Sequence, residues 1–341
     1  MKGLDDGVVK SMSVLVTGGA GYIGSHMVLA LTDQGEDVVV LDNLSTGYWW
    51  AISPKAKLIE GDIGDEALLN RVMADNRFDA VIHFAGSIVV PDSVSDPLGY
   101  YLNNTVKSRA LMAQAVKAKI PRFIFSSTAA VYGNPQGDGP VFETAAPQPI
   151  SPYGSSKLMT EWMLRDAHAA HGLQYVALRY FNVAGADPEG RTGQSTPRAT
   201  HLIKVACQTA LGQRDHMDVF GSDYATPDGT CLRDYIHVSD LISAHVDALG
   251  HLRRGGDSGI FNCGYGKGYS VLDVIKAVER AHGSPFKVNM VGRRAGDPAA
   301  IVAGAERVRE VLGWQPKHED LDFIVASALD WERRLIQRNA A

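Results

Sequence analysis

Short apolar runs alternate with helix-compatible stretches along the first half of the chain. The runs are largely apolar on both faces, have the length of strands, and occupy residues 13–17, 37–41, 57–59, 80–84, 122–126 and 174–179. Stretches with the pattern of helices separate them, among others at 25–31, 67–76 and 105–118. Strands buried on both faces and joined by helices are typical of a parallel sheet that helices cover on both sides. The pattern therefore predicts an α/β fold with a doubly wound, parallel Rossmann-type sheet.

The second half of the chain follows a looser pattern. Turn-rich stretches fill 185–197 and 221–229, and apolar runs at 235–238 and 260–262 predict a return to the large sheet. We therefore expect one domain over residues 13–182 together with about 234–262. The remaining residues, 183–233 and 263–341, are expected to form a smaller, irregular C-terminal domain that binds the substrate.

Composition narrows the class of protein. A chain of 341 residues with 45% hydrophobic content can bury a large core. Its net charge of -5 offers no basic stripe for nucleic acid, and no apolar run approaches the ~20 residues of a membrane helix. Two aspartates within residues 1–13 stand where a signal peptide has its apolar centre. We expect a soluble, cytoplasmic protein that binds neither nucleic acid nor membrane.

The cysteines agree with this expectation. Cys207, Cys231 and Cys263 are odd in number, widely spaced and in no paired motif. Such cysteines are typically reduced and structural, and no metal site is expected.

A glycine-rich segment near the start predicts a bound dinucleotide. Gly18, Gly21 and Gly24 follow the first predicted strand and precede the first predicted helix. Glycines at these places let the chain turn sharply, admit a pyrophosphate to the helix N-terminus, and let helix and strand pack closely. With 35 glycines a triplet can arise by chance. The order of strand, turn, helix, strand and acid, however, is the context that such a motif needs.

The acid that ends the second predicted strand indicates which dinucleotide binds. Asp42 lies 24 residues after Gly18, near the spacing at which a carboxylate accepts hydrogen bonds from the adenosine ribose hydroxyls. The same carboxylate would repel the 2′-phosphate of NADP. An aspartate after a strand can also simply cap a turn, but in this context it favours NAD.

Tyr153 and Lys157 open a helix-like stretch in mid-chain. Being four residues apart, they lie on the same face of a helix. A free tyrosine titrates near pH 10, so its use as a base near pH 7 needs a pKa lowered by about three units. A nearby ammonium and a positive nicotinamide ring both stabilise the phenolate. With 12 tyrosines the spacing alone is weak evidence, but beside a dinucleotide it predicts redox chemistry on an alcohol.

Polar residues also stand where the predicted strands should end, at 61–63, 85–86 and 126–128. In open α/β sheets, ligands bind outside the carboxyl ends of the strands. A Thr128 hydroxyl there would bridge the substrate oxygen and Tyr153, so that polariser, base and base-activator are all present. The alternative is that the hydroxyls at 126–128 bond to their own backbone.

From about Val14 to Trp331, the chain resembles the UDP-glucose 4-epimerase family of the extended short-chain dehydrogenase/reductase superfamily. Besides the glycine segment, the motifs that carry the resemblance are Leu41-Asp42-Asn43-Leu44, Gly61-Asp62-Ile63, His83-Phe84-Ala85-Gly86, Asn103-Asn104, residues 126–133, Ser151-Pro152-Tyr153, Arg179-Tyr180-Phe181-Asn182 and Arg233-Asp234-Tyr235-Ile236-His237-Val238.

The resemblance implies a reaction without net redox change. Tyr153 would take the proton of the sugar 4-hydroxyl while a hydride passes from carbon 4 to NAD, and the 4-keto sugar would then turn and be reduced on its opposite face. The implied catalytic residues are Tyr153, Lys157 and Thr128. The partner would be a UDP-sugar, and the enzyme would be a homodimer, as family members often are.

The resemblance also implies which residues bind the ligands. Those expected to hold NAD are Gly18, Gly21, Tyr22, Ile23, Gly24, Asp42, Asn43, Asp62, Ile63, Phe84, Ala85, Gly86, Asn103, Ser126, Tyr153, Lys157 and Tyr180. Those expected to hold the UDP-sugar are Thr128, Tyr153, Asn182, His201, Phe220, Arg233, Tyr235, Arg294 and Asp297. Two arginines from separate segments suit a diphosphate, because the guanidinium fork matches phosphate oxygens. The alternative for Arg294 is a solvated surface charge.

Several positions depart from the family pattern. Ser87-Ile88 stands where some members have a lysine that contacts the cofactor, Thr128 replaces a serine, and His201 stands in a segment where others have an asparagine pair. Ile301 replaces a bulky aromatic residue of some members, which would make room for an N-acetyl group at carbon 2.

Rival functions stay open to different degrees. An epimerase for a pentose or uronate nucleotide fits the same residues, whereas Ala129 and Ala130 disfavour dehydratases and decarboxylases, which commonly carry an acid in this loop. A non-catalytic NAD-binding scaffold usually loses the tyrosine or the lysine, and this chain keeps both.

Overall fold

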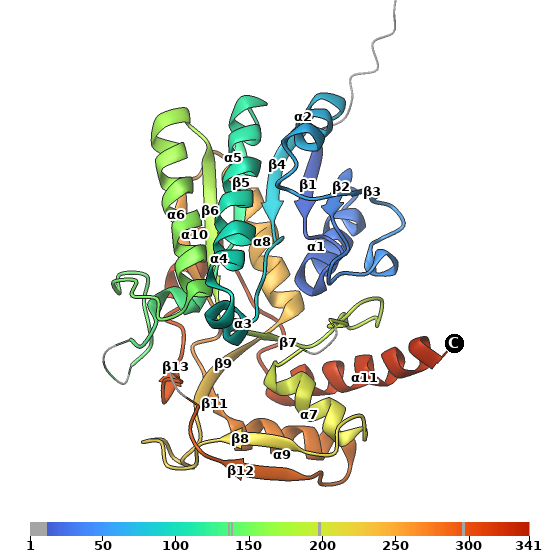
Figure 1. Ribbon diagram of the computed structural model, residues 1–341, viewed down its shortest axis with the longest axis vertical. Helices are drawn as coiled ribbons and strands as arrows, with labels where there is room; N and C mark the ends of the chain where they lie inside the picture. The colour runs from blue at the N-terminus through green and yellow to red at the C-terminus, as the bar shows by residue number, and fades with distance from the viewer. Residues whose placement is uncertain (1–11, 136, 138, 197–198, 295–296, 341) are drawn as a thin grey trace, which may run out of the picture.

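A large parallel sheet forms the centre of the molecule. The computed structural model describes residues 12–135, 137, 139–196, 199–294 and 297–340. Seven strands lie in the order β10-β6-β5-β4-β1-β2-β3, and all neighbours are parallel (Figure 1). Their bounds are Ser13–Thr17 (β1), Val38–Asp42 (β2), Lys57–Glu60 (β3), Phe78–His83 (β4), Arg122–Ser126 (β5), Gln174–Tyr180 (β6) and Gly259–Cys263 (β10).

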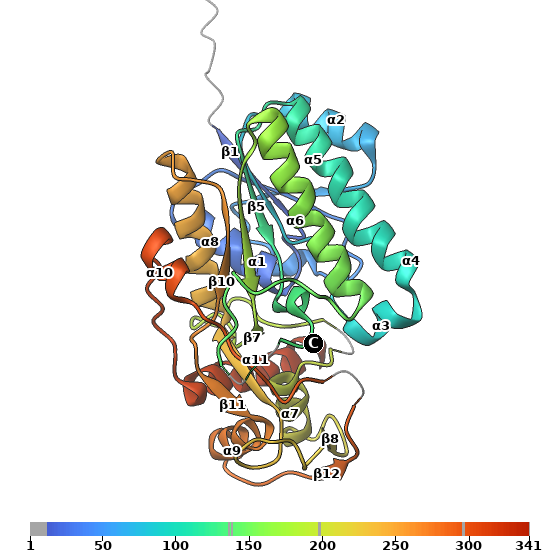
Figure 2. The same cartoon turned by 90° about the vertical axis from the view of Figure 1, so that its left-hand side faces the viewer.

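Helices cover both faces of this sheet, as a doubly wound fold requires. Figure 2 shows α2, α5 and α6 on one side of the strands and α1 and α8 on the other. The bounds are Tyr22–Asp33 (α1), Glu66–Asp75 (α2), Lys107–Lys117 (α5), Pro152–His171 (α6) and Val238–Arg253 (α8). The short helices Val90–Ser95 (α3) and Pro97–Tyr100 (α4) and a π-helical segment, Tyr101–Val106, lead into α5. The doubly wound parallel sheet predicted from the apolar runs is confirmed.

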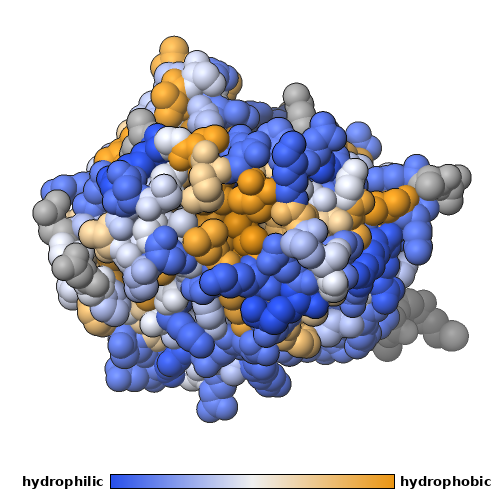
Figure 3. Space-filling view, turned by 90° about the horizontal axis from the view of Figure 1, so that it is seen from below, coloured by the Kyte–Doolittle hydropathy of each residue, from blue (hydrophilic) through white to orange (hydrophobic). Residues whose placement is uncertain are grey.

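Smaller elements gather below the carboxyl ends of these strands. A four-stranded sheet contains Asn182–Ala184 (β7), Leu232–His237 (β9), Gly268–Ser270 (β11) and Ala300–Ile301 (β13), and a two-stranded sheet pairs Met217–Phe220 (β8) with Val288–Val291 (β12). The accompanying helices are Leu202–Ala210 (α7), Val271–His282 (α9) and Leu321–Ala340 (α11), whereas Glu306–Leu312 (α10) packs beside α8 and β10 of the large sheet. Seen from below, this end of the molecule carries an apolar strip among hydrophilic residues (Figure 3).

One predicted return to the large sheet is wrong. Residues 235–237 lie in β9, which pairs with β7, β11 and β13 and not with any strand of the seven-stranded sheet. The run at 260–262 does return, as β10 at the sheet edge beside β6. Both runs are buried and apolar, so their hydropathy could not distinguish the sheet that each one joins.

Two hydrophobic clusters hold the layers together. One fills the space between the sheet and α2, α5 and α6. The other lies between the sheet and α1 and α8, and it continues into α9, α10 and α11. No helix in the described part of the chain has the length and apolar content needed to cross a membrane.

Candidate active site

The glycine segment forms a tight turn between β1 and α1. Gly18 has a φ of +72°, and a Cβ atom there would lie 2.5 Å from the backbone nitrogen of Ala85. A Cβ at Gly24 would lie 2.1 Å from the carbonyl oxygen of Gly18. The α1 helix begins after Gly21 with no side-chain cap, so its first N–H groups face outward. This bare helix end and the absence of side chains fit a dinucleotide pyrophosphate. Tyr22 and Ile23 form the first turn of α1, and the Tyr22 hydroxyl donates to the carbonyl of Gly185 at 2.7 Å.

The substitution Gly18→Ala tests this close approach. We expect it to lose about 1–3 kcal/mol more stability than Gly35→Ala, because the added methyl group collides with the Phe84–Ala85 backbone. Gly35 is a matched control, since its φ is +81° and a Cβ there would meet nothing within 4 Å. Urea unfolding of both variants, together with their NAD content, measures the difference. Equal stabilities would show that the contact with Ala85 does not matter.

Two carboxylates lie at the ends of β2 and β3. Asp42 is buried, and it accepts from the backbone N–H of Ala20 at 2.9 Å and of Leu44 at 2.8 Å. The carboxylate thus joins the glycine turn to the loop after β2. Asp62 accepts from Lys107 at 2.6 Å and from Asn43 at 3.3 Å.

Asp62 is charged at neutral pH. Burial alone would raise its pKa, but hydrogen bonds from Lys107, the Gly64 backbone and Asn43 lower the pKa on balance. The neighbouring Ile63 is buried. Asn43, Asp62 and Ile63 therefore follow the neighbouring strands β2 and β3, at the same edge of the sheet as Asp42.

The segment after β4 also lies at the carboxyl edge of the large sheet. Phe84 donates its backbone N–H to Thr17 at 2.9 Å, which holds the segment against the glycine turn. Its ring lies 4.9 Å from that of His245. A Cβ at Gly86 would lie 3.0 Å from Oδ1 of Asn104 and 3.7 Å from Nζ of Lys157. Gly86 thus keeps open the space beside the lysine.

Tyr153 and Lys157 lie on the first turns of α6, as the spacing predicts. Ser151 caps this helix by accepting from the N–H of Gly154 at 3.2 Å. The Lys157 ammonium donates to the carbonyl of Ser126 at 3.0 Å and lies 4.9 Å above the ring of Phe125. Thr128 neighbours Tyr153, where its hydroxyl lowers the pKa of the phenol, and it accepts from the N–H of Ala130 at 3.1 Å. The structure therefore brings together the predicted base, cation and hydroxyl at the carboxyl end of β5.

The protein groups around Tyr153 do not by themselves make its phenol acidic. Burial raises the pKa of Tyr153, the neighbouring Tyr180 raises it further, and the hydrogen bond from Thr128 opposes them. Burial also lowers the pKa of Lys157 to about 8. None of the groups that shift the Tyr153 pKa is a cation, so the lowered phenol pKa predicted from the sequence depends on a positive charge close to the phenol.

The three hydroxyls at the end of β5 point to different partners. The Ser126 hydroxyl lies 2.6 Å from that of Tyr180, and burial raises the pKa of Tyr180 to about 12. Ser127 instead donates to Glu161 at 2.6 Å, and Glu161 forms a buried ion pair with Arg179. Ser127 therefore belongs to a structural network. The local backbone bond predicted as the alternative occurs at Thr128, which accepts from the N–H of Ala130.

A buried chain of hydrogen bonds near Lys157 was not predicted. Ser108 donates to the carbonyl of Asn104 at 2.5 Å, so its oxygen accepts from Nε2 of His83, 2.7 Å away. Nδ1 of His83 then accepts from Thr17 at 2.7 Å. Burial, followed by the charge of Lys157, lowers the pKa of His83 to about 3, so the ring is neutral.

The adjacent residues Asn103 and Asn104 make different hydrogen bonds in this region. Asn104 is buried; its side chain donates to the carbonyl of Ser87 at 2.9 Å and to Ser156 at 3.1 Å. Asn103, the residue predicted from the sequence, donates to the Ser87 hydroxyl at 2.9 Å. Both belong to the π-helical segment, whose wider turn the sequence did not indicate. The Asn-Asn pair was the only signal, and it does not tell which amide faces inward.

The predicted substrate residues lie on the smaller sheets. Asn182 on β7 pairs with Tyr235 on β9. Arg233, also on β9, donates to the carbonyl of Pro298 at 2.9 Å and lies 3.9 Å from Asp297.

The second predicted arginine lies at the surface. Arg294 makes two hydrogen bonds to Asp297, of 3.0 and 3.2 Å, and its guanidinium lies 5.2 Å from the centre of the Phe220 ring. About half of the Arg294 side chain is exposed. Ala295 and Gly296, which complete the predicted motif, lie outside the described residues.

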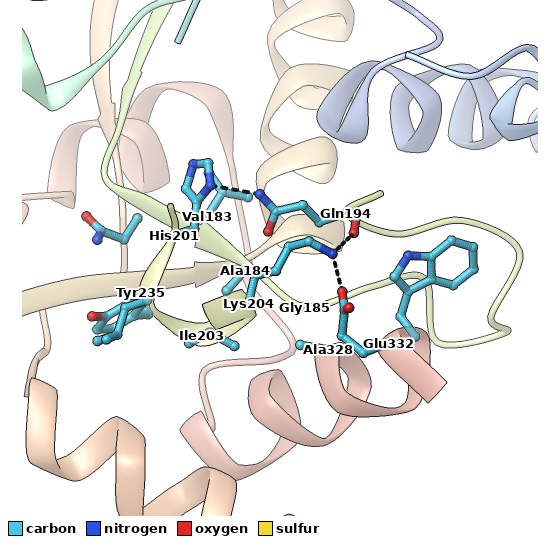
Figure 4. A pocket seen from close by; sticks show the side chains of 13 residues that line it. Val183, Ala184, Gly185, Gln194, His201, Ile203, Lys204, Tyr235, Ala328 and Glu332 are labelled. Atoms are coloured by element: carbon cyan, nitrogen blue, oxygen red, sulfur yellow. Dashed lines mark hydrogen bonds and ion pairs between the residues drawn. The ribbon is translucent and has the colours of Figure 1, made fainter. Parts of the chain in front are cut away.

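A cavity of about 30 Å³ joins three of the predicted residues, Asn182, His201 and Tyr235 (Figure 4). Gln194, Lys204, Trp331 and Glu332 also line it. Lys204 and Glu332 form a buried ion pair, and Gln194 donates to Nδ1 of His201 at 2.8 Å. Phe220, Arg233, Arg294 and Asp297 do not line this cavity. No sequence signal pointed to Gln194, Lys204 or Glu332.

Residues 14–264 match the model of the NAD dependent epimerase/dehydratase family. The chain belongs to this family. Membership confirms the family resemblance drawn from the sequence motifs, and with it the prediction of NAD as the cofactor.

Individual relatives agree with the family model. The chain is 61% identical to a UDP-glucose 4-epimerase of Azospirillum brasilense, over 98% of this chain and 96% of the relative. Among solved epimerase structures, that of the Brucella ovis UDP-glucose 4-epimerase in complex with NAD is 45% identical, with a TM-score of 0.91 over 94% of this chain and 98% of that one. The UDP-Glc/GlcNAc 4-epimerase of Campylobacter jejuni is 46% identical, with a TM-score of 0.84 over 95% of this chain and 100% of that one.

Proposed function

We infer that the chain catalyses the NAD-dependent 4-epimerisation of a UDP-hexose and interconverts UDP-glucose and UDP-galactose. The observation that carries this function is the 61% identity to a UDP-glucose 4-epimerase over 98% of the chain. The grouping of Tyr153, Lys157 and Thr128 supports it, since these residues offer a base, a cation and a hydroxyl to one alcohol carbon.

In the proposed mechanism, Tyr153 takes the proton of the sugar 4-hydroxyl and later returns it. Thr128, whose hydroxyl neighbours the phenol, donates to or accepts from the same sugar oxygen and keeps it in line with the phenol. NAD, when bound, supplies reversible redox chemistry at carbon 4. Lys157 holds a positive charge beside the phenolate and stabilises it electrostatically. The sugar has to turn its other face to the same base, so the UDP part must be held more firmly than the sugar.

The proposed cofactor site follows the carboxyl edge of the sheet. We assign the pyrophosphate to the glycine turn and the first turn of α1, and the adenosine end to the group of Asp42, Asn43, Asp62 and Ile63. Toward Tyr153, the residues proposed to hold the nicotinamide half are Phe84, Ala85, Gly86, Asn103, Ser126 and Tyr180.

The proposed UDP site lies on the smaller sheets. Asn182, His201 and Tyr235 surround the cavity, while Arg233 and Arg294 come from separate segments that share Asp297. Two guanidinium groups suit a diphosphate. The exposed Phe220 ring beside Arg294 offers a flat apolar face for uracil.

Incubation of the purified protein with UDP-galactose, without added NAD, tests the reaction. We expect UDP-glucose to form while the absorbance of reduced nicotinamide stays low, because the redox change at carbon 4 is reversed within the same site. If NAD is bound but no UDP-glucose forms, the proposed UDP-hexose substrate is wrong and other nucleotide sugars become the candidates.

A second candidate function is the 4-epimerisation of UDP-N-acetylhexosamines. Ile301 on β13 pairs with Arg233 on β9, which places this aliphatic side chain beside the proposed UDP site. The Campylobacter jejuni relative is a UDP-Glc/GlcNAc 4-epimerase. Rates with UDP-N-acetylglucosamine, UDP-xylose and UDP-glucuronate separate the alternatives, and an absence of turnover with the N-acetyl sugar would exclude this second function.

We also propose that the enzyme is a homodimer. Leu98, Leu102 and Val106 follow one another at four-residue intervals and are 78%, 54% and 51% exposed, and Trp162 on α6 is 48% exposed. Apolar side chains gathered on helices in this way are typical of a surface that a partner covers. Sedimentation analysis at micromolar concentration would reveal a monomer if this surface were not an interface.

Two further proposals concern location and domain division. We propose that the enzyme works in the cytoplasm, where its three free, buried cysteines stay reduced.

We also propose a division into an NAD-binding domain, 13–182 with about 234–262, and a nucleotide-sugar-binding domain, 183–233 and 263–341. The seven-stranded sheet supports this division, except that residues 234–237 lie in β9 of the smaller sheet.

A further inference from the structure

A buried ion pair lines the cavity beside the proposed UDP site. Lys204 on α7 and Glu332 on α11 contact each other directly, and each side chain is only 3% exposed. Lys204 also donates to the carbonyl of Gln194 at 2.7 Å. The second carboxylate oxygen of Glu332, Oε2, has no partner among the described residues. Figure 4 shows Lys204 between Gln194 and Glu332, with His201 on the far side of Gln194.

Fold stability does not explain this pair. Moving two charges out of water costs about as much as their attraction returns, and well-packed apolar residues are often as stable or more stable in the same place. Lys204 is the third residue of α7, whose first turn holds no acidic residue. A cation at the N-terminus of a helix opposes the helix dipole. The pair therefore calls for a role other than stability.

The contacts of Lys204 lead directly to His201. Lys204 holds the carbonyl of Gln194, and the side-chain amide of Gln194 donates to Nδ1 of His201 at 2.8 Å. Because Nδ1 accepts this hydrogen bond, the ring proton lies on Nε2. Burial, and then the charge of Lys204, lowers the pKa of His201, so the ring stays neutral at pH 7. His201 thus offers one N–H donor in a fixed direction.

The α11 helix fixes both sides of Gln194. Trp331 precedes Glu332, and a Cβ on Gly193 would lie 2.4 Å from the Trp331 ring. The indole N–H of Trp331 donates to the Ser195 hydroxyl at 3.3 Å. The residues before and after Gln194 are therefore held by Trp331, and Gln194 itself is held through Lys204 by Glu332.

We propose that Lys204 and Glu332 are positioning residues for the UDP-sugar: they fix Gln194, and through it the direction and the tautomer of His201. The inference rests on the proposed function, because it assumes that UDP binds beside His201. The cavity that these residues line contains none of Tyr153, Lys157 and Thr128. Lys204 and Glu332 act on the binding of the whole nucleotide and not on the chemical step, so they affect KM and not kcat.

The double variant Lys204→Met, Glu332→Leu removes both charges and leaves no unpaired ion. We expect its KM for UDP-galactose and its Kd for UDP to rise about tenfold, a change of about 1.4 kcal/mol that matches the loss of one oriented hydrogen bond. The melting temperature, the NAD content and kcat are expected to stay close to wild type. This rise in KM and Kd should be absent when the same double variant is made in a His201→Ala background, because Lys204 and Glu332 act through His201.

A second ion pair on α11 supplies the control. Arg280 and Asp322 join α9 to α11 at the surface, where both side chains are more than half exposed. Arg280→Gln, Asp322→Asn should leave the Kd for UDP unchanged. An unchanged Kd in Lys204→Met, Glu332→Leu, or a rise of equal size in the His201→Ala background, would overturn the inference.

Direct calorimetric binding of UDP keeps this test separate from the test of the reaction. If the wild type binds UDP but epimerises no UDP-sugar, the proposed function fails while the comparison of Kd values still decides the role of the pair. If the wild type does not bind UDP, both proposals are wrong.

Discussion

Replacement of Tyr153 by phenylalanine is expected to lower the turnover of UDP-galactose by roughly 10³-fold. The variant keeps the ring, which is 7% exposed, and loses only the phenol hydroxyl. The fold and the bound NAD should therefore persist. The decisive measurements are kcat, the NAD released on denaturation, and the melting temperature. Retention of a tenth or more of the wild-type turnover would show that another group is the base.

Tyr132→Phe is the matched control for this variant. The Tyr132 hydroxyl is also buried, but it donates to Asn262 at 2.6 Å and accepts from Arg179 at 3.0 Å, inside the structural network of α6 and β6. Its loss should leave these two groups short of a partner and lower the melting temperature, by an amount that corresponds to about 1–3 kcal/mol. The enzyme that remains folded should convert UDP-galactose with the wild-type kcat. The two variants thus separate a chemical role from a structural one.

Lys157→Met should have the second-largest effect, a loss of roughly 10²-fold in kcat at pH 7. Burial lowers the pKa of Lys157 to about 8, so the wild-type ammonium is charged below that pH and is lost above it. Because the charge stabilises the phenolate, wild-type kcat/KM should fall as the pH rises through about 8.

The pH profile of Lys157→Met should have the opposite slope. Without the ammonium, the phenol of Tyr153 has to ionise against the burial that raises its pKa, so activity should increase up to the alkaline limit of stability. Rates from pH 6 to 10, with the NAD content measured in parallel, would detect the reversal. A profile parallel to that of the wild type would mean that Lys157 serves only to bind the cofactor.

Much of the fold could be predicted because buried parallel strands have a simple signal. The run at 122–126 coincides with β5, and the run at 174–179 falls one residue short of β6. Hydropathy reports burial, however, and not the neighbour that buries a strand. For this reason hydropathy predicts the run at 235–238 in the large sheet. The structure instead has residues 235–237 in β9, beside β7, β11 and β13.

The site shows the same division between local and long-range information. Tyr153 and Lys157 could be placed together because a helix fixes their spacing. Ser127 and Thr128 carry equivalent hydroxyls, and only the position of Glu161 on α6 draws Ser127 away from the site. Lys204 and Glu332 are 128 positions apart. Nothing local to either residue indicates that α7 and α11 bring their charges into contact.

The hydrophobic cluster on the α1 and α8 side of the sheet carries a consequence for how such enzymes diversify. It includes Val28 of α1, Ile275 of α9, Val308 of α10 and Ile324 of α11 without interruption. Residues 263–341 therefore do not form a module that could be exchanged for that of a relative without cost, since transplanted residues would expose or mismatch this shared interior. Point substitutions around the site, in contrast, leave this shared interior intact.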